Sequence, residues 1–195
     1  YIPKTERIIT IEDNAELQIR HIPNLVRLEA RNANVEGCVP ISIRDLIRTS
    51  LRMRPDRIIV GEVRGGEAVD MIQAMNTGHD GSMSTGHANS AKDMMSRLEI
   101  MILQGAELPI AAIRAQIASA LDIVVHLGRL RDKSRKVLEI AEVLGIQEGE
   151  IAMRTIFRFE ERGECNGKIT GVWVRENELE KKDKLALAGI RLPDG

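Results

Sequence analysis

A short apolar run near the middle of the chain ends in an acid that could do chemistry. Ile58–Val60 are β-branched and do not alternate with polar residues, which is typical of a strand buried on both faces of a parallel sheet. Gly61 and Glu62 follow directly. Open α/β sheets bind ligands at the carboxyl ends of their strands, where an acid can hold Mg²⁺, directly or through water, or orient an attacking water. The simpler alternative is a buried strand followed by a solvated acid.

Two further stretches carry residues of the same kind. A β-branched run near the start of the chain ends in Glu12 and, after a turn, Glu16. The stretch Thr77–Ser90 combines glycines, which permit tight turns, with His79 and His87. Acids at strand ends and a loop rich in glycine and histidine could converge on one phosphate and its metal ion. The spacing of the two histidines is not that of a common zinc motif.

An alternation of strand and helix patterns is expected to position these residues. Strands are predicted near residues 7–12, 25–30, 58–60, 82–86, 122–127 and 137–143. Helices are predicted after Ser42 and Ser90, each an N-cap with an acid three residues later, over residues 68–75, and from Pro109. This alternation predicts an α/β fold with a mostly parallel sheet. From about residue 130 the strands follow one another directly, which predicts an antiparallel extension, and residues 176–188 predict a terminal helix.

Together, the three stretches resemble the motifs of the secretion ATPases that drive type II secretion, type IV secretion and type IV pilus assembly. The likeness is closest to the CpaF/TadA branch, which powers Flp-type, or tight-adherence, pili. Thr10–Leu17 resembles the Asp box of that family, Leu51–Glu67 its Walker B region and Thr77–Ser90 its His box. The resemblance covers roughly residues 5 to 160. Three motifs in the same order are a far more specific signal than any one of them.

The resemblance implies a partial RecA-like P-loop NTPase core that uses ATP and Mg²⁺. In such a core Glu62 would be the Walker B acid near Mg²⁺ and the attacking water. Glu12 and Glu16 of the Asp box would help to position metal and water, and either could serve as the general base. The resemblance therefore implies an ATP hydrolase whose catalytic residues are these three acids.

The same resemblance implies an assembly. Arg64 would contact the nucleotide or a neighbouring subunit, while His79 and His87 would sense the γ-phosphate or line the seam between subunits. The family forms rings of six, so we expect a homo-hexamer in the cytoplasm, peripheral to the bacterial inner membrane and bound to its pilus or secretion platform. Residues 1–130 would form the partial ATPase domain with all three motifs, and residues 131–195 the C-terminal β extension and helix.

One feature departs from the family. The P-loop pattern G-x-x-x-x-G-K-[ST] does not occur in the sequence. The nearest stretch, Gly163–Thr170, has three residues between its glycines and Ile169 after its lysine, and it predicts a hairpin turn. The chain also begins at Tyr1 without a methionine. We expect a C-terminal fragment whose missing part holds the phosphate cradle, and therefore a fragment that is inactive alone.

Composition narrows the classes of partner. The net charge of −1 and the aromatic content of 2% argue against a nucleic-acid surface. No apolar stretch reaches the roughly 18 residues that a membrane span needs. Cys38 and Cys165 lack the spacing of a metal-binding pair and are expected to be reduced thiols. Two alternatives stay open: a non-catalytic scaffold or assembly module of the same machinery, and a RecA-like DNA motor.

Overall fold

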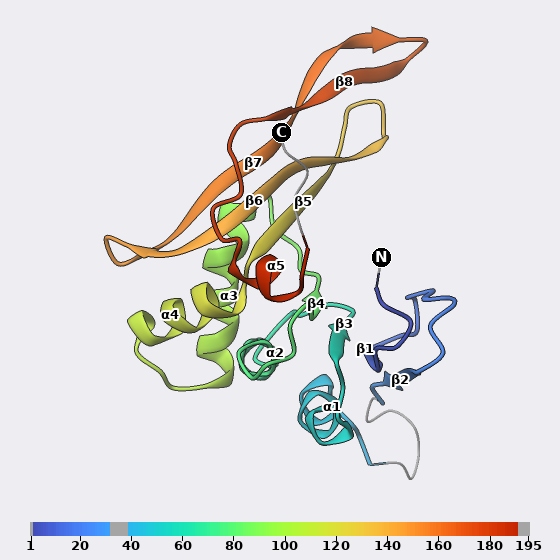
Figure 1. The fold of residues 1–195 in the computed structure, drawn as a ribbon, viewed down its shortest axis with the longest axis vertical. Helices are drawn as coiled ribbons and strands as arrows, with labels where there is room; N and C mark the ends of the chain where they lie inside the picture. The colour runs from blue at the N-terminus through green and yellow to red at the C-terminus, as the bar shows by residue number, and fades with distance from the viewer. Residues whose placement is uncertain (1, 32–38, 191–195) are drawn as a thin grey trace.

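The structure, a computed structural model, describes residues 2–31 and 39–190, which form two four-stranded sheets with helices gathered around the first (Figure 1). The strands are β1 Ile8–Glu12, β2 Leu25–Glu29, β3 Arg57–Val60, β4 Met83–Ser84, β5 Ile123–Arg129, β6 Arg135–Gln147, β7 Glu150–Cys165 and β8 Lys168–Arg175. The helices are α1 Ile43–Ser50, a 3₁₀ turn Leu51–Met53, α2 Ala68–Met75, α3 Ala91–Gly105, α4 Ile110–Ala120 and α5 Asp183–Leu187. The first sheet has the order β2-β1-β3-β4 and is parallel, whereas the second has the order β5-β6-β7-β8 and is antiparallel.

Local sequence signals fix the helix ends where they were predicted. The Ser42 side chain accepts the backbone N–H of Asp45, and the Asp45 carboxylate accepts the backbone N–H of Ser42, which completes a capping box. The 3₁₀ turn after α1 stops at Arg54, whose φ of 52° is left-handed, directly before Pro55. The Ser90 side chain likewise accepts the backbone N–H of Asp93 at the start of α3, without the reciprocal bond from the acid.

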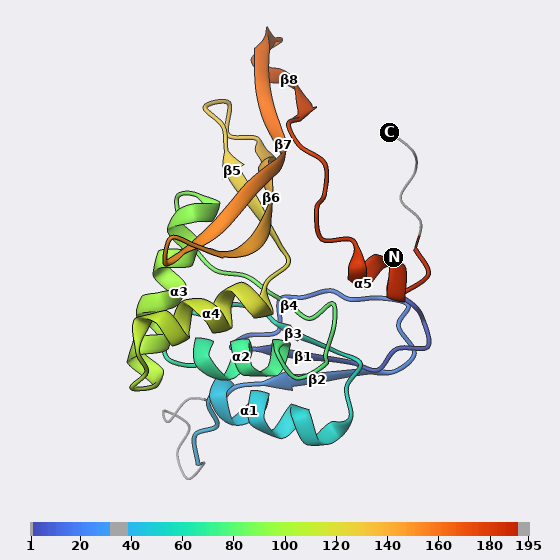
Figure 2. The same ribbon diagram turned by 60° about the vertical axis from the view of Figure 1, so that its left-hand side comes forward.

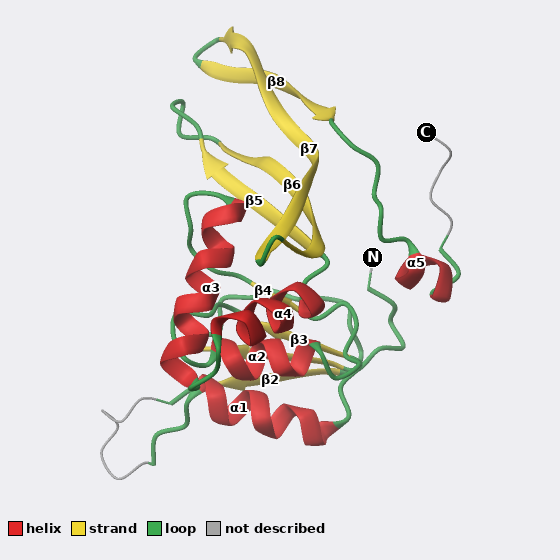
Figure 3. Ribbon diagram, turned by 90° about the vertical axis from the view of Figure 1, so that its left-hand side faces the viewer, coloured by secondary structure: helices red, strands yellow, loops and turns green. Residues whose placement is uncertain are grey.

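The first sheet is the centre of the hydrophobic core. All five residues of β1 are buried, as expected for a strand inside a parallel sheet. Figure 3 shows α1 and α2 lying across one face of this sheet, with α3 and α4 beyond α2. The apolar side chains packed between sheet and helices include Ile9, Ile11, Ile47, Ile58, Val60, Ile72 and Ile102. The predicted parallel sheet is therefore confirmed.

The second sheet projects away from the helices and the first sheet (Figures 1 and 2). Its contacts with the helices are made by β6 and β7 against α4, and by β5 against α3. The antiparallel sheet begins one strand earlier than predicted, because β5 pairs with β6 from Ile123 opposite Glu142 onward. An apolar β-branched run such as β5 suits either kind of sheet, and the neighbouring β6 decides which forms. The division into domains at residue 130 stays a prediction.

The predicted terminal helix over residues 176–188 is wrong for its first half, since only α5 is helical. The segment before α5 is extended because β6 holds its backbone. The carboxylate of Glu142, only 1% exposed, accepts the backbone N–H of Glu180 at 2.9 Å and of Lys181 at 2.6 Å. A tertiary hydrogen bond thus outweighs the helix propensity of this segment.

The false P-loop is the turn of a hairpin, as predicted. β7 and β8 are joined by Asn166 and Gly167, with φ of 50° and 71°, the left-handed values that a tight hairpin turn needs. Cys165 beside this turn is an exposed free thiol. Cys38 and Tyr1 lie outside the described residues.

No helix in the described ranges is, on its own, long and apolar enough to cross a membrane. α3 and α4 reach the required length and composition only as a pair bent by 120°, and their apolar residues belong largely to the core.

Candidate functional site

The candidate site lies at the carboxyl edge of the parallel sheet, where β3 and β4 end side by side. The Thr85 hydroxyl donates to the carbonyl oxygen of Gly61 at 2.5 Å, and the Val63 backbone N–H donates to the Thr85 carbonyl at 3.0 Å. These two bonds hold the chain after β3 against the chain after β4. Glu62, between Gly61 and Val63, therefore emerges at the edge where the sequence predicted it.

Glu62 makes two unequal contacts at this edge. Its Oε1 forms an ion pair with Arg64, and its buried Oε2 lies 3.3 Å from His87 Nε2 with no good hydrogen-bond geometry. The hydrogen bond from Arg64, followed by the charges of Arg64 and His87 and by the weaker contact with the His87 ring, lowers the pKa of Glu62 despite partial burial. Glu62 is therefore ionised at neutral pH, and its buried Oε2 contacts only the exposed imidazole of His87 among the described residues.

Glu12 anchors the turn that follows β1. It is 6% exposed, and its Oε1 accepts the backbone N–H of Glu16 at 3.0 Å and of Leu17 at 2.8 Å. A Cβ on Gly61 would come within 2.9 Å of Glu12 Cγ, so the missing side chain of Gly61 leaves room for the acid. The Oε1 atom of Glu12 thus stabilises the conformation of the Asp-box turn.

Asp13 and Glu16 lie close enough to Arg64 for their charges to act on it. The pKa of Arg64 is raised first by its hydrogen bond to Glu62, then by the charge of Glu62, and further by the charges of Asp13 and Glu16. The turn after β1 and the loop after β3 therefore bring their charged residues together, as predicted. Asp13 was not among the predicted site residues, although its position beside Glu12 in the same motif was a signal for it.

His79 does not lie with this group. Its Nδ1 is 3.1 Å from the carbonyl oxygen of Ala74 and its backbone carbonyl accepts the Ser82 hydroxyl, which in turn accepts the backbone N–H of Ile58. His79 is thus near the amino end of β3, about 13 Å along the strand from Glu62. The structure does not bring His79 to the Glu62 site within one chain, so sensing of a phosphate bound there has no support. A place at a subunit seam stays a prediction.

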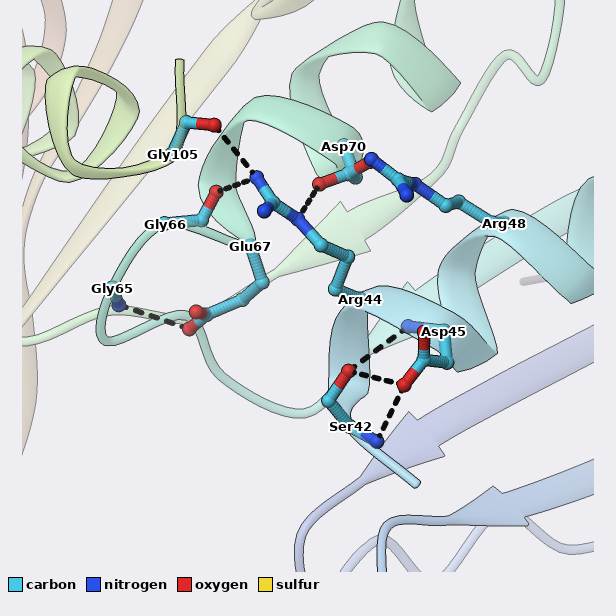
Figure 4. A network of polar contacts seen from close by, with 9 residues as sticks. All are labelled: Ser42, Arg44, Asp45, Arg48, Gly65, Gly66, Glu67, Asp70 and Gly105. Carbon is cyan, nitrogen blue, oxygen red and sulfur yellow. Dashed lines mark hydrogen bonds and ion pairs between the residues drawn. The ribbon is translucent and has the colours of Figure 1, made fainter. Parts of the chain in front are cut away.

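Three residues that the sequence did not single out support the loop after Glu62. Glu67 accepts the backbone N–H groups of Arg64 and Gly65 at 2.7 and 2.9 Å. Arg44 and the buried Asp70 hold the next part of the loop (Figure 4). Asp70 gave no signal in the sequence, because it lies on the polar side of the helix pattern of residues 68–75 together with Gln73.

The chemistry of this edge suits an anion together with a cation. An ionised acid, a guanidinium and an imidazole lie within contact distance, with two further acids near the guanidinium. Among residues 2–31 and 39–190, no group of three or more His, Cys, Asp or Glu side chains could hold a metal ion by itself. A metal at this edge would need ligands from a bound substrate or from water.

Comparison with known proteins points to one family. Residues 1–174 match the family described as "Type II/IV secretion system protein". The chain is 47% identical over 152 residues to a putative conjugal transfer protein of Mycobacterium tuberculosis, an alignment that covers 78% of this chain and 42% of the relative. It is 40% identical over 144 residues to the type IV secretion system protein PtlH of Bordetella pertussis, with 71% and 42% covered.

A solved structure gives the same answer for the fold. The crystal structure of the VirB11 ATPase from the Brucella suis type IV secretion system, in complex with sulphate, aligns with a TM-score of 0.63 and 38% identity. The alignment covers 71% of this chain and 40% of that one. The predicted RecA-like α/β fold is thereby confirmed. The chain spans less than half the length of the relatives that it matches.

Proposed function

This chain belongs to the type II/IV secretion system protein family, and on that premise we propose that it is the catalytic C-terminal part of an ATPase that powers secretion. The observation that carries the proposal is the Glu62 group at the carboxyl edge of the parallel sheet. Ligands bind at this edge in open α/β sheets. A scaffold has no need of an ionised acid whose buried oxygen contacts only an exposed imidazole at a ligand-binding edge.

Mg²⁺ fits the residues at this edge. Glu62 Oε2 is buried and contacts only the exposed His87 ring among the described residues, and carboxylate oxygen is the ligand type that Mg²⁺ prefers. Mg²⁺ is usually held by one or two carboxylates plus phosphate oxygens and waters, so a single acid is sufficient on the protein side. When bound, the metal would neutralise charge on the phosphates during phosphoryl transfer.

The chain's own residues would supply positioning and charge. Glu62, directly or through water, would fix the metal and orient the attacking water. Arg64 would meet the negative charge of the transferring phosphoryl group, because its side chain is 66% exposed and its guanidinium already contacts Glu62. Glu16 is the freer of the two Asp-box glutamates, since Glu12 has given its Oε1 to two backbone N–H groups. His87 would report the phosphate state through its contact with Glu62.

We propose further that the full protein works as a homo-hexamer favoured by ATP and Mg²⁺. The exposed positions of Arg64 and His87, 66% and 82% exposed, leave both available to a neighbouring subunit. A head-to-tail ring would set one subunit against the nucleotide edge of the next. The ring would act in the cytoplasm, on the platform proteins of a Flp-type pilus or a secretion system in the bacterial inner membrane.

A second candidate function is a non-catalytic assembly module of the same machinery. It is favoured by one observation, the absence of a P-loop pattern from these 195 residues. The catalytic proposal accordingly places the phosphate cradle in a part of the protein outside them, which agrees with the greater length of the relatives.

ATP turnover by two forms of the protein separates the two candidates. The longer protein that carries this chain together with a P-loop should hydrolyse ATP with Mg²⁺. The 195-residue chain alone should show no turnover above a Glu62→Ala control. Absence of turnover in the longer protein, assayed as a folded hexamer, would favour the assembly module. A monomer at micromolar concentration with a slowly hydrolysed nucleotide, measured by light scattering, would rule out the ring.

A further inference from the structure

Arg44 joins three segments that are distant in the sequence (Figure 4). It lies in the first turn of α1, and its Nε donates to Asp70 Oδ2 in α2 at 2.5 Å. Its Nη2 donates to two backbone carbonyl oxygens, that of Gly66 at 3.1 Å and that of Gly105 at 3.0 Å. One guanidinium therefore holds together α2, the loop after Arg64 and the last residue of α3.

Asp70 fixes the orientation of this guanidinium. It is 4% exposed, and its second oxygen accepts Arg48 Nε at 2.8 Å. A buried carboxylate with two arginine partners is restricted to one orientation by charge-assisted hydrogen bonds. Arg48 is 63% exposed and makes no hydrogen bond to the loop. Both arginines therefore bind Asp70, but only Arg44 also binds the loop.

The loop rests directly on the end of α3. A Cβ on Gly66 would lie 2.9 Å from Gly105 Cα, and a Cβ on Gly105 would lie 2.2 Å from the carbonyl oxygen of Gly66. Both distances are below what real Cβ atoms adopt, so the two backbones pack with no side chain between them. The Arg44 bonds to both carbonyls close this contact from the side.

Contacts continue from the loop to the proposed site. Glu67 binds the backbone N–H groups of Arg64 and Gly65, and the Arg64 side chain forms the ion pair with Glu62. Apart from the contact with Glu62, the Arg64 side chain makes no hydrogen bond among the described residues. Its position therefore depends on the backbone of the loop. On a loose loop, an exposed arginine side chain would occupy many positions and would seldom take the orientation that catalysis needs.

We propose that Arg44 and Asp70 are positioning residues of the ATPase site. They touch neither nucleotide nor metal, and they fix residues 64–67 so that Arg64 is held beside Glu62. The inference deepens the proposed function and rests on it. It also assigns a reason for the two glycines, Gly66 and Gly105, which the packing of loop on helix requires.

Arg44→Lys in the longer, P-loop-containing protein tests the proposal, with Arg48→Lys as the matched control. Lysine at 44 keeps a charge for Asp70 but lacks the fork that reaches both carbonyls. We expect kcat to fall about tenfold with KM for ATP little changed, because a misplaced group costs transition-state contacts more than binding. Arg48→Lys should leave kcat within about twofold. Equal effects of the two variants, or a normal kcat in Arg44→Lys, would overturn the proposal.

Two further measurements guard against a variant that fails to fold. In the unmodified 195-residue chain, the amides of Arg64 and Gly65 should exchange with deuterium as slowly as amides in the middle of α2. Exchange as fast as in residues 18–22, whose amides have no hydrogen-bond acceptor among the described residues, would overturn the proposal without any substitution. Asp70→Asn keeps the shape and removes the charge that orients Arg44, so it should speed exchange at Arg64. Exchange is independent of turnover, so an inactive longer protein would refute the proposed function and leave this test intact.

Discussion

The two sheets differ in how completely their buried carboxylates are satisfied. In the antiparallel sheet, arginines contact one or two glutamates: Arg162 pairs with Glu160 at 2.7 Å, and Arg158 contacts Glu139 at 3.6 Å and Glu176, the residue after β8, at 2.6 Å. At the carboxyl edge of the parallel sheet, Arg64 pairs with Glu62 and feels the charges of Asp13 and Glu16, and the buried Oε2 of Glu62 contacts only the exposed His87 among the described residues. The buried carboxylate of the antiparallel sheet, Glu142, has hydrogen-bond partners on both oxygens and therefore leaves no oxygen for a ligand to satisfy. An unbalanced group at a sheet edge is what an anion with its metal ion can complete.

Glu62→Gln should produce the largest effect, because it removes a charge from the unbalanced group. We expect turnover of the longer protein to fall about a hundredfold or more, as for other single electrostatic groups. Nucleotide binding should persist, since the glutamine keeps the shape. Steady-state turnover and nucleotide titration measure the two quantities. Glu160→Gln, in a matched pair of the other sheet, should change neither, and a similar loss there would remove the contrast.

His87→Ala should have the second largest effect, and it allows the two histidines of one loop to be compared. His87 contacts Glu62, whereas His79 bonds the end of α2 near the opposite edge. We expect His87→Ala to lower turnover about tenfold without weakening nucleotide binding, and His79→Ala to lower it by less than about twofold. The same assays apply. Turnover that is lost equally in both variants would mean that His79 acts at the site from a neighbouring subunit.

Glu142→Ala tests the one buried acid of the antiparallel sheet. Its loss would leave the backbone N–H groups of Glu180 and Lys181 without their acceptor and Arg154 without a buried partner. We expect the free energy of unfolding to fall by about 1–3 kcal/mol, measured by urea denaturation of the 195-residue chain. Glu178→Ala, at an exposed position of the same segment, should cost less than about 0.5 kcal/mol. If both cost the same, Glu142 does not hold the segment.

Substitution of Asp132, which lies in a turn of the antiparallel sheet, should have the smallest effect, and that effect is on stability. Hydrogen bonds from the Ser134 side chain and from the backbones of Ile169 and Ser134 lower its pKa from 3.8 to about 2. Because the folded pKa is the lower one, this stabilisation is present above about pH 4 and is lost as pH falls towards 2. Asp132→Asn should therefore lower the melting temperature at pH 6 and make little difference near pH 2. A difference that is constant with pH would contradict this.

Local chemistry was readable from the sequence wherever neighbours along the chain decide the structure. Ser42 and Ser90 cap their helices with the acid three residues later, and Asn166 with Gly167 forms the predicted hairpin turn. The buried run before Glu62 gave both the strand and the edge to which the acid is delivered. Each of these features needs only residues within a few positions of one another.

Features that depend on distant partners were not readable. The pairing of β5 with β6 and the extended segment held by Glu142 both depend on contacts across the second sheet. His79 and His87 lie on either side of a strand of only two residues, so no periodicity shows that they leave the sheet at opposite edges. Arg44 and Asp70 are 26 positions apart, and neither helix pattern indicates that their side chains meet.

The outer edge of β5 has a practical consequence for handling the isolated chain. No other strand of the described residues pairs with this edge, and its Ile123, Val125 and Leu127 are 43%, 47% and 64% exposed. Their spacing of two residues sets them on one face beside a row of free backbone groups, which is the arrangement that promotes strand-to-strand aggregation. Precipitation should therefore limit the concentration at which the chain can be kept. A lysine in place of Leu127 would blunt the edge without touching the residues around Glu62.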